Sequence, residues 1–523
     1  MIGILPLLGK LLYGRKVRSF LRGLDRPQEA QEACLKRILT RSQGTVYGRR
    51  HKFSDISTPE AYQENIPLTT YDDLKPYYES ISKGAENILY PDKTYQFMIT
   101  SGTTGRQKYI PLSLYSLGEN RTINEIVIAK LFSLAKGLDG LRAQSFSFSA
   151  PAVIPEYQYG KYKCGYLTGI IGAKGAAQGG LFSRLGRIWP SDEVLNMTDW
   201  TEKSYRLALE IIPLDIRIMM GLPSNLCSFF RTLIDDIAQR LMSDPQVSSS
   251  IKETIQNAQR RGELDLRRLW PKLHLVVYGG IHIDPYLPFL ESYFSPIRSL
   301  GVYQATEGYL GLEWYGEGIN PSLRTIFLEF IPADNPDARP RLISEVRRDV
   351  VYSPLITTSG GFYRYELGDH IIFTKLNPPT IKIIGRAGTV ASLVGERLQE
   401  TQLNNALQAA CEATGATIGA FMAVPVVTRK RTAYDIYIEF RREPPDLAEF
   451  EARFDDELRK LNHSYNYERR AEVIAPARFI TLPPRTLERI PAAKHGVDGA
   501  GKVPVIGTLK LVKQLPIPLK IVK

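Results

Sequence analysis

The chain has 523 residues, too many for one ordinary hydrophobic core, so we expect a large domain together with a smaller one. Hydrophobic residues make up 43% and charged residues 23% of the chain, which is typical of a globular protein. The net charge of +12 is spread thinly and its densest basic patches are doublets, which argues against a nucleic-acid partner. The 4 cysteines form no CxxC and the 6 histidines no paired spacing, which argues against a zinc ribbon, a disulfide framework and a built-in metal site.

The N-terminal stretch MIGILPLLGKLLYGRKVRSF begins with apolar residues and carries its positive charges after them. This order does not fit a secretory signal, and no small-residue cleavage site follows it. The stretch predicts an amphipathic helix that docks on the domain surface, with a helix lying at a membrane surface as the alternative. No later stretch has the roughly 18 uninterrupted apolar residues of a membrane span, so we expect no integral membrane segment and a cytoplasmic protein.

Between about residues 95 and 375, short apolar runs that end at Gly or Pro alternate with helical patterns. This alternation predicts an α/β fold with mixed or parallel sheets flanked by helices. The run KLHLVVYGG (272–280) predicts a buried strand that brings Gly279 and Gly280 to the carboxyl edge of a sheet, where ligands bind in such folds. SLGVYQATEG (299–308) repeats this pattern, whereas GIIGAKGAAQGG (169–180) predicts a mobile loop, either a lid or an ordinary surface loop.

The pattern changes after IIGRAGTV (383–390). YDIYIEF (434–440) alternates as a strand does, and DLAEFEARFDDELRKLN (446–462) has apolar residues at three- and four-residue spacing, which predicts a helix with one buried face. Asp446 and Glu449 are suited to cap its first turn. We therefore expect an N-terminal domain over 1–384, a hinge over 385–390 that contains Arg386, and an α+β C-terminal domain over 391–523, although the glycine-flanked arginine also fits a plain turn.

The stretch ITSGTTGRQKYIPLS (99–113) is rich in glycine and hydroxyl side chains but is not a Walker loop, because only two residues separate its glycines. Backbone N–H groups exposed by glycine, hydroxyls and a cation would together form a concave anion site. A glycine-rich hairpin whose hydroxyls satisfy their own turn is the alternative. The candidate anion-binding residues are Ser101, Gly102, Thr103, Thr104, Gly105 and Lys108.

The element YQATEG (303–308) places an aromatic ring, a hydroxyl and a carboxylate directly after a predicted strand. Tyr303 can stack on a nucleotide base, Thr306 can reach a phosphate or carboxylate oxygen, and Glu307 can hold the magnesium ion that ATP brings. In GFYRYELGDHI (361–371), Asp369 follows a glycine and can accept hydrogen bonds from both hydroxyls of a ribose. An aspartate that only caps a turn is the alternative there.

In this order the motifs resemble those of adenylate-forming enzymes, and more specifically those of the acyl acid amido synthetases of the auxin-responsive Gretchen Hagen 3 family. TSGTTGRQK resembles the family's Ser-Ser-Gly-Thr-Ser/Thr-x-Gly-x-x-Lys, with one Ser-to-Thr change and one residue fewer before Gly105. YQATEG resembles Tyr-x-x-Ser/Thr-Glu, and FYRYELGD resembles Tyr-Arg-x-Gly-Asp. LNHSYNYERR (461–470) fits Leu-Asn-x-x-Tyr-x-x-x-Arg and GKVP (501–504) fits Lys-x-Pro, so the likeness spans about residues 95 to 510.

The resemblance implies an adenylate-forming N-terminal domain that binds ATP and an acyl acid, and a mobile C-terminal domain. It implies an ATP- and Mg²⁺-dependent ligase that activates a carboxylic acid as an acyl adenylate and transfers the acyl group to an amine, typically of an amino acid. The implied catalytic residues are Lys502, Thr306 and Glu307, with Glu307 also on the metal. The implied ATP-binding residues are Ser101, Gly102, Thr103, Thr104, Gly105, Lys108, Gly279, Gly280, Tyr303, Asp369 and Arg386.

Two departures from the family pattern each remove a cation near the expected phosphates: Glu366 replaces the Arg of Tyr-Arg-x-Gly-Asp, and Val505 replaces the Arg that usually follows Lys-x-Pro. A non-catalytic nucleotide-binding protein is therefore an alternative interpretation, and an acyl-CoA ligase, which would share the first half-reaction, is another. The sequence does not identify the acid, the amine or the oligomeric state, because apolar pocket walls discriminate by only about 1 to 3 kcal/mol per methylene. The segment 146–169 is our candidate for part of the acid pocket.

Overall fold

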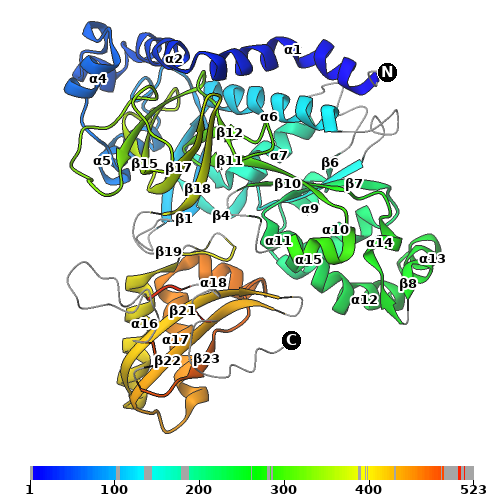
Figure 1. The fold of residues 1–523 in the computed structure, drawn as a ribbon. Helices are drawn as coiled ribbons and strands as arrows, with labels where there is room; N and C mark the ends of the chain where they lie inside the picture. Colours follow the sequence, from blue (N-terminus) through cyan, green and yellow to red (C-terminus); the bar gives the residue numbers. More distant parts are fainter. Residues whose placement is uncertain are drawn as a thin grey trace.

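In the computed structural model the chain forms three parts: a layer of N-terminal helices, a region of sheets and helices, and a C-terminal unit (Figure 1). The described residues are 4–101, 107–134, 144–177, 188–260, 262–279, 283, 287–386, 390–394, 396, 398–428, 431–484, 486–487, 505–507 and 512. Among them, no helix is long and apolar enough to cross a membrane.

The chain begins with a layer of helices, drawn in blue along the top of Figure 1. As predicted, the N-terminal helix docks on the protein surface: it packs against the long helix α6, and Phe20 contacts Trp314 with ring centroids 6.0 Å apart. Thr58 caps the fourth helix and is followed by a proline, the combination that typically begins a helix. The elements are α1 (Ile4–Asp25), α2 (Pro27–Ser42), α3 (Val46–Arg50), η1 (Phe53–Asp55), α4 (Pro59–Asn65), α5 (Tyr71–Ser82) and α6 (Leu114–Leu134).

A seven-stranded sheet forms the centre, in the order β13-β12-β11-β10-β7-β3-β6. Its strands from β6 to β11 are parallel, whereas β12 and β13 are antiparallel to their neighbours. The predicted strands at 272–280 and 299–308 are confirmed as β10 and β11. The strands are β3 (Gln144–Phe148), β6 (Ile188–Trp189), β7 (Ile216–Gly221), β10 (Leu275–Gly279), β11 (Arg298–Ala305), β12 (Gly308–Leu312) and β13 (Asn320–Pro321).

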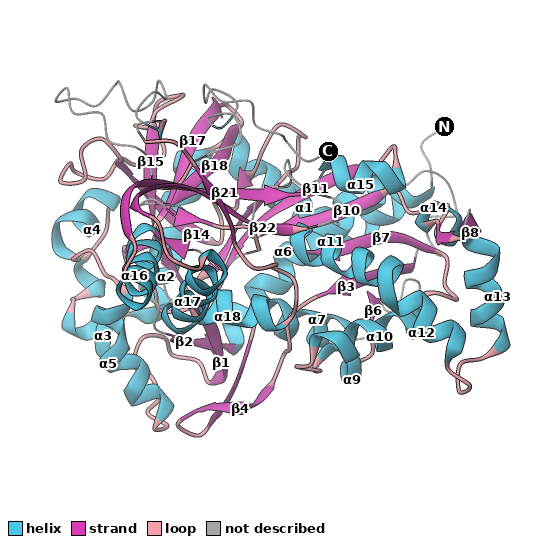
Figure 2. Cartoon of the chain, turned by 90° about the horizontal axis from the view of Figure 1, so that it is seen from below, coloured by secondary structure: helices cyan, strands magenta, loops and turns pink. Residues whose placement is uncertain are grey.

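Helices cover the central sheet, and Figure 2 shows α10 to α13 gathered at the end of the molecule that holds β3 and β7. The segment 169–180 is not a loop as predicted, because its residues up to Ala177 belong to α7. Ala and Ile residues between its glycines favour helix, and Gly169 packs so closely on Ala150 that a Cβ would lie 2.2 Å from the carbonyl oxygen. The remaining elements are α7 (Leu167–Ala177), α9 (Asp192–Leu195), α10 (Trp200–Ile211), α11 (Pro223–Thr232), the π-helix η3 (Leu233–Ile237), α12 (Ala238–Ser243), α13 (Ser249–Ala258), β8 (Gln259–Arg260), β9 (Glu263–Leu264), α14 (Leu266–Leu269) and α15 (Leu287–Phe294).

Two further sheets flank the central one. The first has the order β2-β1-β5-β4, and its edge strand β4 extends outward in Figure 2 with most residues exposed. The second is antiparallel, in the order β14-β15-β17-β18 with β16 paired to β15. Their strands are β1 (Thr94–Ser101), β2 (Gln107–Ser113), β4 (Ile154–Tyr159), β5 (Tyr162–Gly165), β14 (Ile326–Pro332), β15 (Val351–Thr358), β16 (Tyr365–Glu366), β17 (Asp369–Leu376) and β18 (Pro379–Arg386).

The C-terminal elements, yellow to red in Figure 1, form an α+β unit below the other sheets. The predicted strand and helix are confirmed, and the side chain of Asp446 accepts hydrogen bonds from Ala448 N and Glu449 N at the start of the helix. Of the predicted hinge, Gly385 and Arg386 belong to β18 and 387–389 lie outside the described residues, so the domain boundaries remain a prediction. The elements are β19 (Val390–Ala391), β20 (Leu398–Gln399), α16 (Glu400–Thr414), β21 (Thr417–Val427), β22 (Thr432–Arg442), α17 (Leu447–Leu461), α18 (His463–Arg470) and β23 (Arg478–Thr481).

A buried ion pair joins the antiparallel sheet to the N-terminal helices. Arg364 has a left-handed backbone (φ 48°), is 5% exposed and lies 3.1 Å from Glu329, which is 1% exposed. Its guanidinium also donates to the carbonyl oxygens of Gln63 and Ile66 at 2.7 and 2.6 Å. One side chain therefore satisfies a buried carboxylate and two backbone carbonyls at the end of α4.

We predict that Arg364→Ala lowers the free energy of unfolding by about 3 kcal/mol, because it leaves the Glu329 carboxylate buried without its cation. Arg348→Ala is the matched control, because its ion pair with Asp349 is exposed, and it should cost less than about 1 kcal/mol. Denaturant unfolding of the full chain measures both values. Equal effects of the two substitutions would contradict the prediction.

Candidate functional site

Thr306 and Glu307 form the turn between β11 and β12. Ala305 pairs with Gly308, so the two residues stand alone at the tip of this hairpin, at the carboxyl end of a parallel strand. A Cβ on Gly308 would lie 2.9 Å from the end of the Ile326 side chain, which would have to move to admit a larger residue. Strand β11 and its tight turn thus bring a hydroxyl and a carboxylate to the sheet edge where ligands bind in open α/β folds.

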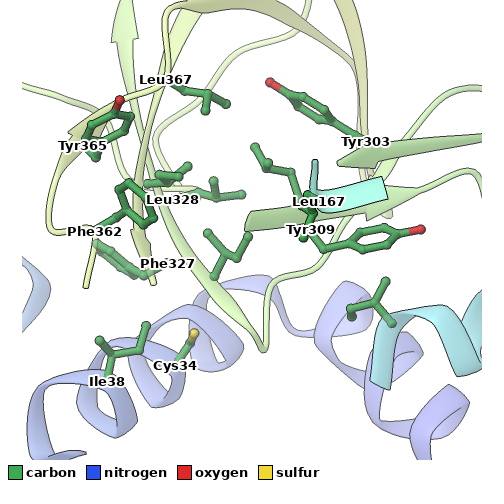
Figure 3. Close-up of a cluster of buried hydrophobic side chains, with 14 of the residues drawn as sticks. Cys34, Ile38, Leu167, Tyr303, Tyr309, Phe327, Leu328, Phe362, Tyr365 and Leu367 are labelled. Carbon is green, nitrogen blue, oxygen red and sulfur yellow. The ribbon is translucent and has the colours of Figure 1, made fainter. Parts of the chain in front are cut away.

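Asp369 contacts the strand that leads to this turn, although 66 positions separate it from Tyr303. The Tyr303 hydroxyl donates a 2.6 Å hydrogen bond to Asp369 Oδ2. In Figure 3 the hydroxyls of Tyr303 and Tyr365 both point away from the helix that carries Cys34 and Ile38. Tyr303 is 5% exposed, so its ring as placed offers little surface for base stacking, and its hydroxyl instead orients the carboxylate.

Arg386 is the strand partner of Asp369. The register of β17 and β18 places these residues directly opposite each other. Arg386, in the predicted hinge, is thus the last residue of β18, and its backbone lies opposite that of the predicted ribose-binding residue.

The glycine- and hydroxyl-rich stretch joins β1 to β2. Ser101 pairs with Gln107 at the end of this antiparallel ladder, whereas Gly102, Thr103, Thr104 and Gly105 lie outside the described residues. Lys108 is opposite Thr100, and its Nζ lies 5.2 Å from the centroid of the Tyr71 ring. The two described ends of the stretch therefore pair as a hairpin. Both the predicted anion site and the alternative, a glycine-rich hairpin without a ligand, agree with this pairing.

Of the glycine pair after β10, Gly279 is described and Gly280 is not. A Cβ on Gly279 would lie 2.9 Å from Val302 Cγ2, so close packing of β10 on β11 requires this glycine. Lys502 also lies outside the described residues. The predicted roles of these residues toward ATP remain predictions.

A cavity of about 30 Å³ lies behind the Thr306–Glu307 turn, with room for about two water molecules. Strands β1, β2, β12 and β14, helix α6 and the turn after β15 line it, and it opens to solvent. The polar side chains in its wall are Ser116, Glu119, Asn120, Thr306, Glu307, Thr325 and Thr358. Glu307 also receives a 3.5 Å hydrogen bond from the Tyr365 hydroxyl through its Oε1.

Glu119 is a second carboxylate at this cavity, and the motifs did not indicate it. It pairs with Arg37 of α2 at 2.9 Å and accepts a hydrogen bond from the Ser359 hydroxyl. Burial raises the pKa of Glu119 to about 7, although Arg37 opposes the shift. Glu119 and Asn120 lie in a helix whose buried positions are otherwise mostly apolar, and this interruption is the signal that could have revealed them.

The backbone after β3 is held from several sides. Lys203 on α10 is fully buried and donates to the carbonyl oxygens of Ser149 and Leu195, both at 2.7 Å. Burial lowers the pKa of Lys203 to about 7. Asn196 accepts hydrogen bonds from the backbone N–H groups of Ala152 and Val153. These contacts fix the carboxyl end of β3, which lies within the segment predicted to line the acid pocket.

The C-terminal motif LNHSYNYERR is a structural network. Asn462 caps α18 by accepting from Tyr465 N, and its amide donates to the carbonyl oxygen of Glu396 at 2.8 Å. The Tyr465 hydroxyl donates to Asp455, and Arg469 contacts both oxygens of the same carboxylate. The motif residues therefore bind α17 and α18 to each other.

The C-terminal unit contacts the rest of the protein through α18 and the β21–β22 hairpin. The Tyr467 ring lies 6.4 Å from Tyr166 and 6.3 Å from Trp200. On the other side of the contact, Arg231 of α11 donates to the Thr432 hydroxyl at 2.8 Å. Arg231 also donates to the carbonyl oxygen of Thr428, so aromatic packing and hydrogen bonds from this guanidinium hold the two units together.

Glu468 lies at this contact and is 9% exposed; its Oε2 has no hydrogen-bond partner among the described residues. Burial, and then the nearby Glu396 carboxylate, raise the pKa of Glu468 well above its usual value. Burial and the Glu468 charge also raise the pKa of Tyr166, across the contact. The contact between the two units therefore disfavours the charged form of the Glu468 carboxyl.

Family models match three successive segments of the chain. The GH3 family N-terminal domain matches residues 16–298, the GH3 family central domain 321–386 and the GH3 family C-terminal domain 401–508. The first match alone covers more than half of the 523 residues.

Curated relatives and solved structures agree with these matches. A probable indole-3-acetic acid-amido synthetase GH3.2 of Oryza sativa subsp. japonica is 24% identical over 91% of this chain and 86% of its own length. The 4-substituted benzoates-glutamate ligase GH3.12 of Arabidopsis thaliana is 23% identical over 80% of each chain. The structure of the GH3.15 acyl acid amido synthetase superposes with a TM-score of 0.59 at 19% identity, covering 95% of this chain and 94% of its own. A 2-hydroxyisobutyryl-CoA ligase has the same fold (TM-score 0.55, 14% identity, 93% and 91% coverage).

We predict that Glu468→Gln raises thermal stability at pH 8 and changes it little at pH 5. The carboxyl pKa is raised in the folded protein, so the wild type loses stability as pH rises above the unfolded value of about 4.3, whereas glutamine does not titrate. The expected increase in Tm at pH 8 is about 2 °C. Melting curves from pH 5 to 8 measure it, with Glu472→Gln, at an exposed position after α18, as the control. A Tm difference that does not grow with pH would contradict the prediction.

Proposed function

The chain belongs to the GH3 family, and its curated homologues in this family are acyl acid amido synthetases. We propose that the chain is itself an ATP-dependent enzyme of this kind. It activates a small carboxylic acid as an acyl adenylate and transfers the acyl group to the amine of an amino acid. The observation that carries the proposal is the convergence of two distant motifs, in which Tyr303 donates to Asp369 beside the Thr306–Glu307 turn.

Asp369 is the proposed ribose-binding residue. The Tyr303 hydroxyl donates to Asp369 Oδ2 and fixes the orientation of the carboxylate. In the proposed complex this carboxylate accepts hydrogen bonds from the sugar hydroxyls. Arg386, directly opposite in the strand register, supplies a cation next to this carboxylate and close to the start of the proposed hinge. Gly279 and Gly280 would form the floor under the adenine at the neighbouring strand end.

Thr306 is the proposed contact to the α-phosphate, and Glu307 is the proposed ligand of Mg²⁺. The donor set fits this ion, because carboxylate, hydroxyl and amide oxygens surround the cavity behind the turn. When bound, Mg²⁺ neutralises phosphate charge and favours departure of pyrophosphate. Ser101, Gly102, Thr103, Thr104, Gly105 and Lys108 are the proposed cradle of the departing phosphates.

The proposed reaction has two steps. A carboxylate oxygen of the acid attacks the α-phosphorus of ATP, and the bond to the bridging oxygen of the β-phosphate breaks, so pyrophosphate leaves. The amine nitrogen then attacks the acyl carbon, AMP leaves with the electrons of the C–O bond, and the amine loses a proton. In the first step Lys502 is proposed to bridge the substrate carboxylate and the α-phosphate, after closure of the C-terminal domain excludes water.

The substrates are proposed from the relatives. The relatives' names specify indole-3-acetic acid and 4-substituted benzoates as acids and glutamate as an amine acceptor. We therefore propose a small carboxylic acid and an amino acid as the substrate classes, with the fixed backbone after β3 forming part of the acid pocket. The described cysteines are free thiols, which agrees with our expectation of a cytoplasmic reaction.

We predict that the purified protein catalyses ATP–pyrophosphate exchange that depends on a carboxylic acid, and that Glu307→Ala and Lys502→Ala each abolish it. Exchange measures adenylation alone, across a panel of aromatic, aliphatic and hydroxy acids. Glu317→Ala and Lys460→Ala, at exposed positions away from the turn, are the matched controls and should retain exchange. Full exchange in both the Glu307 and Lys502 variants would overturn the assignment of these residues.

The second step is tested by adding amino acids and coenzyme A separately to the adenylating protein. Amide formation with amino acids is the expected outcome. Thioester formation with coenzyme A alone would identify an acyl-CoA ligase, an activity found on the same fold in the 2-hydroxyisobutyryl-CoA ligase. Nucleotide binding without any pyrophosphate release would identify a non-catalytic protein.

A separate prediction concerns Asp369. Asp369→Asn should raise the KM for ATP about tenfold, because a charged acceptor is worth roughly 1.5 kcal/mol more than a neutral one. The KM for the acid should change little, since the proposed contact is to ribose. Steady-state exchange rates at varied ATP measure the effect, and an unchanged KM for ATP would remove Asp369 from the proposed ribose site.

A further inference from the structure

Helix α1 has two faces with different surroundings. The first face packs on the protein, and its line of residues, at spacings of four, three and four positions, is Tyr13, Val17, Phe20 and Leu24. Phe20 is 5% exposed and Leu24 is fully buried, and Val17 packs against the same hydrophobic core. This face accounts for the docking of α1, so the composition of the opposite, outward face requires a separate explanation.

The outward face carries a line of unpaired arginines. Arg15, Arg18 and Arg22 follow one another at spacings of three and four positions, and all three are exposed. None of them forms an ion pair with a described residue, whereas Lys16, on the flank of the helix, is paired with Glu125 of α6. Adjacent cations without a carboxylate repel one another, so this face favours an anionic partner.

Toward its N-terminus the outward face becomes apolar. Counting back from Arg15 by four, three and four positions gives Leu11, Leu8 and Ile4, so these positions share the helix line of the arginines. Leu12, beside this line, is 42% exposed although it is a large apolar residue. The outward line of positions is thus apolar over its first half and cationic over its second half.

This combination favours a lipid surface over other anionic partners. A nucleic acid would attract cations along the whole helix, and it offers no apolar phase to the first half. An anionic lipid surface offers both environments, because its headgroups attract arginine and its acyl chains bury apolar side chains. Helices of this composition lie in the plane of the membrane interface.

The place of α1 in the fold allows such contact. The helix runs along the top edge of the molecule in Figure 1, on the side away from the C-terminal unit. Asp25 is the single carboxylate of α1 and its last residue, so the cations of the outward face outnumber it. The net charge of +12 also favours approach of the whole protein to an anionic surface.

We infer that the outward face of α1 binds the surface of an anionic membrane. Arg15, Arg18 and Arg22 contact the lipid headgroups, and Leu12, with the apolar positions before it, enters the acyl region. The docked face stays on α6, so the protein is held at the membrane without crossing it. Salt weakens this association, because the headgroup contacts are exposed. The inference does not depend on the proposed enzymatic function.

The test is co-sedimentation of the full chain with phosphatidylcholine vesicles that contain about one third phosphatidylserine, in roughly 0.1 M salt. The wild type should bind these vesicles, and should bind vesicles of phosphatidylcholine alone about tenfold more weakly or less. The combined substitution Arg15→Gln, Arg18→Gln and Arg22→Gln should weaken binding about a hundredfold, since each cation near the surface contributes about fivefold. Leu12→Gln should weaken it roughly tenfold, because it removes an apolar side chain from the acyl region.

A triple variant elsewhere on the surface is the matched control. Arg206→Gln, Arg348→Gln and Arg453→Gln together remove the same net charge from exposed positions on α10, before β15 and on α17. This variant should bind the anionic vesicles within about twofold of the wild type, because its changes lie outside α1. All the substituted side chains are exposed, so the Tm of each variant should match that of the wild type.

Three results would overturn the inference. A wild type that does not bind the anionic vesicles would exclude the membrane as the partner of this face. An equal loss of binding in the control variant would show that only net charge attracts the protein to the vesicles. Self-association of the wild type that is lost in Leu12→Gln, without vesicle binding, would show that the outward face contacts a second copy of the chain.

Discussion

The hydrogen bond from Tyr303 to Asp369 is the constraint on which the arrangement of the site depends. Tyr303 belongs to the central, mostly parallel sheet and Asp369 begins a strand of the antiparallel sheet, so this contact joins the two sheets, together with the backbone hydrogen bonds between Ile319 and Ile381. Both residues are more than nine-tenths buried, so a shift between the sheets would break a hydrogen bond that water cannot readily replace. The position of the Thr306–Glu307 turn relative to Asp369 is therefore fixed by the packing of the sheets.

The same packing explains why the chain tolerates its two departures from the family pattern. Glu366 is exposed, and its contact with Thr69 is made by the backbone N–H, so a glutamate in place of an arginine removes no buried interaction. Val505 joins the C-terminal sheet through its carbonyl oxygen, which accepts from Ala423 N at 2.7 Å. The arginine of the Tyr-Arg motif that does remain, Arg364, is used for folding, since it neutralises Glu329.

Much of the fold could be predicted from the spacing of apolar residues. The sequences of β10 and β11 show the apolar run of a buried strand, and the sequence of α17 shows the spacing of a helix with one buried face. The segment 169–180 was wrongly predicted as a loop, because glycine content suggested mobility whereas close packing on the 150–152 backbone requires small residues in helix α7. The site was predictable where its residues are adjacent in sequence, as in the Thr306–Glu307 turn. Glu119 and Tyr365 were not, because tertiary packing of α6 brings Glu119 to the cavity and packing of the antiparallel sheet brings the Tyr365 hydroxyl to Glu307.

Two of the buried polar atoms without a hydrogen-bond partner among the described residues lie on α18, where the C-terminal unit contacts Tyr166: the Tyr467 hydroxyl and Glu468 Oε2. Burial and the nearby Glu396 carboxylate raise the pKa of Glu468 well above its usual value, so the contact disfavours the charged carboxylate. A carboxyl group that is buried in this way, without a donor or a cation, has a charge that depends on contact between the two units.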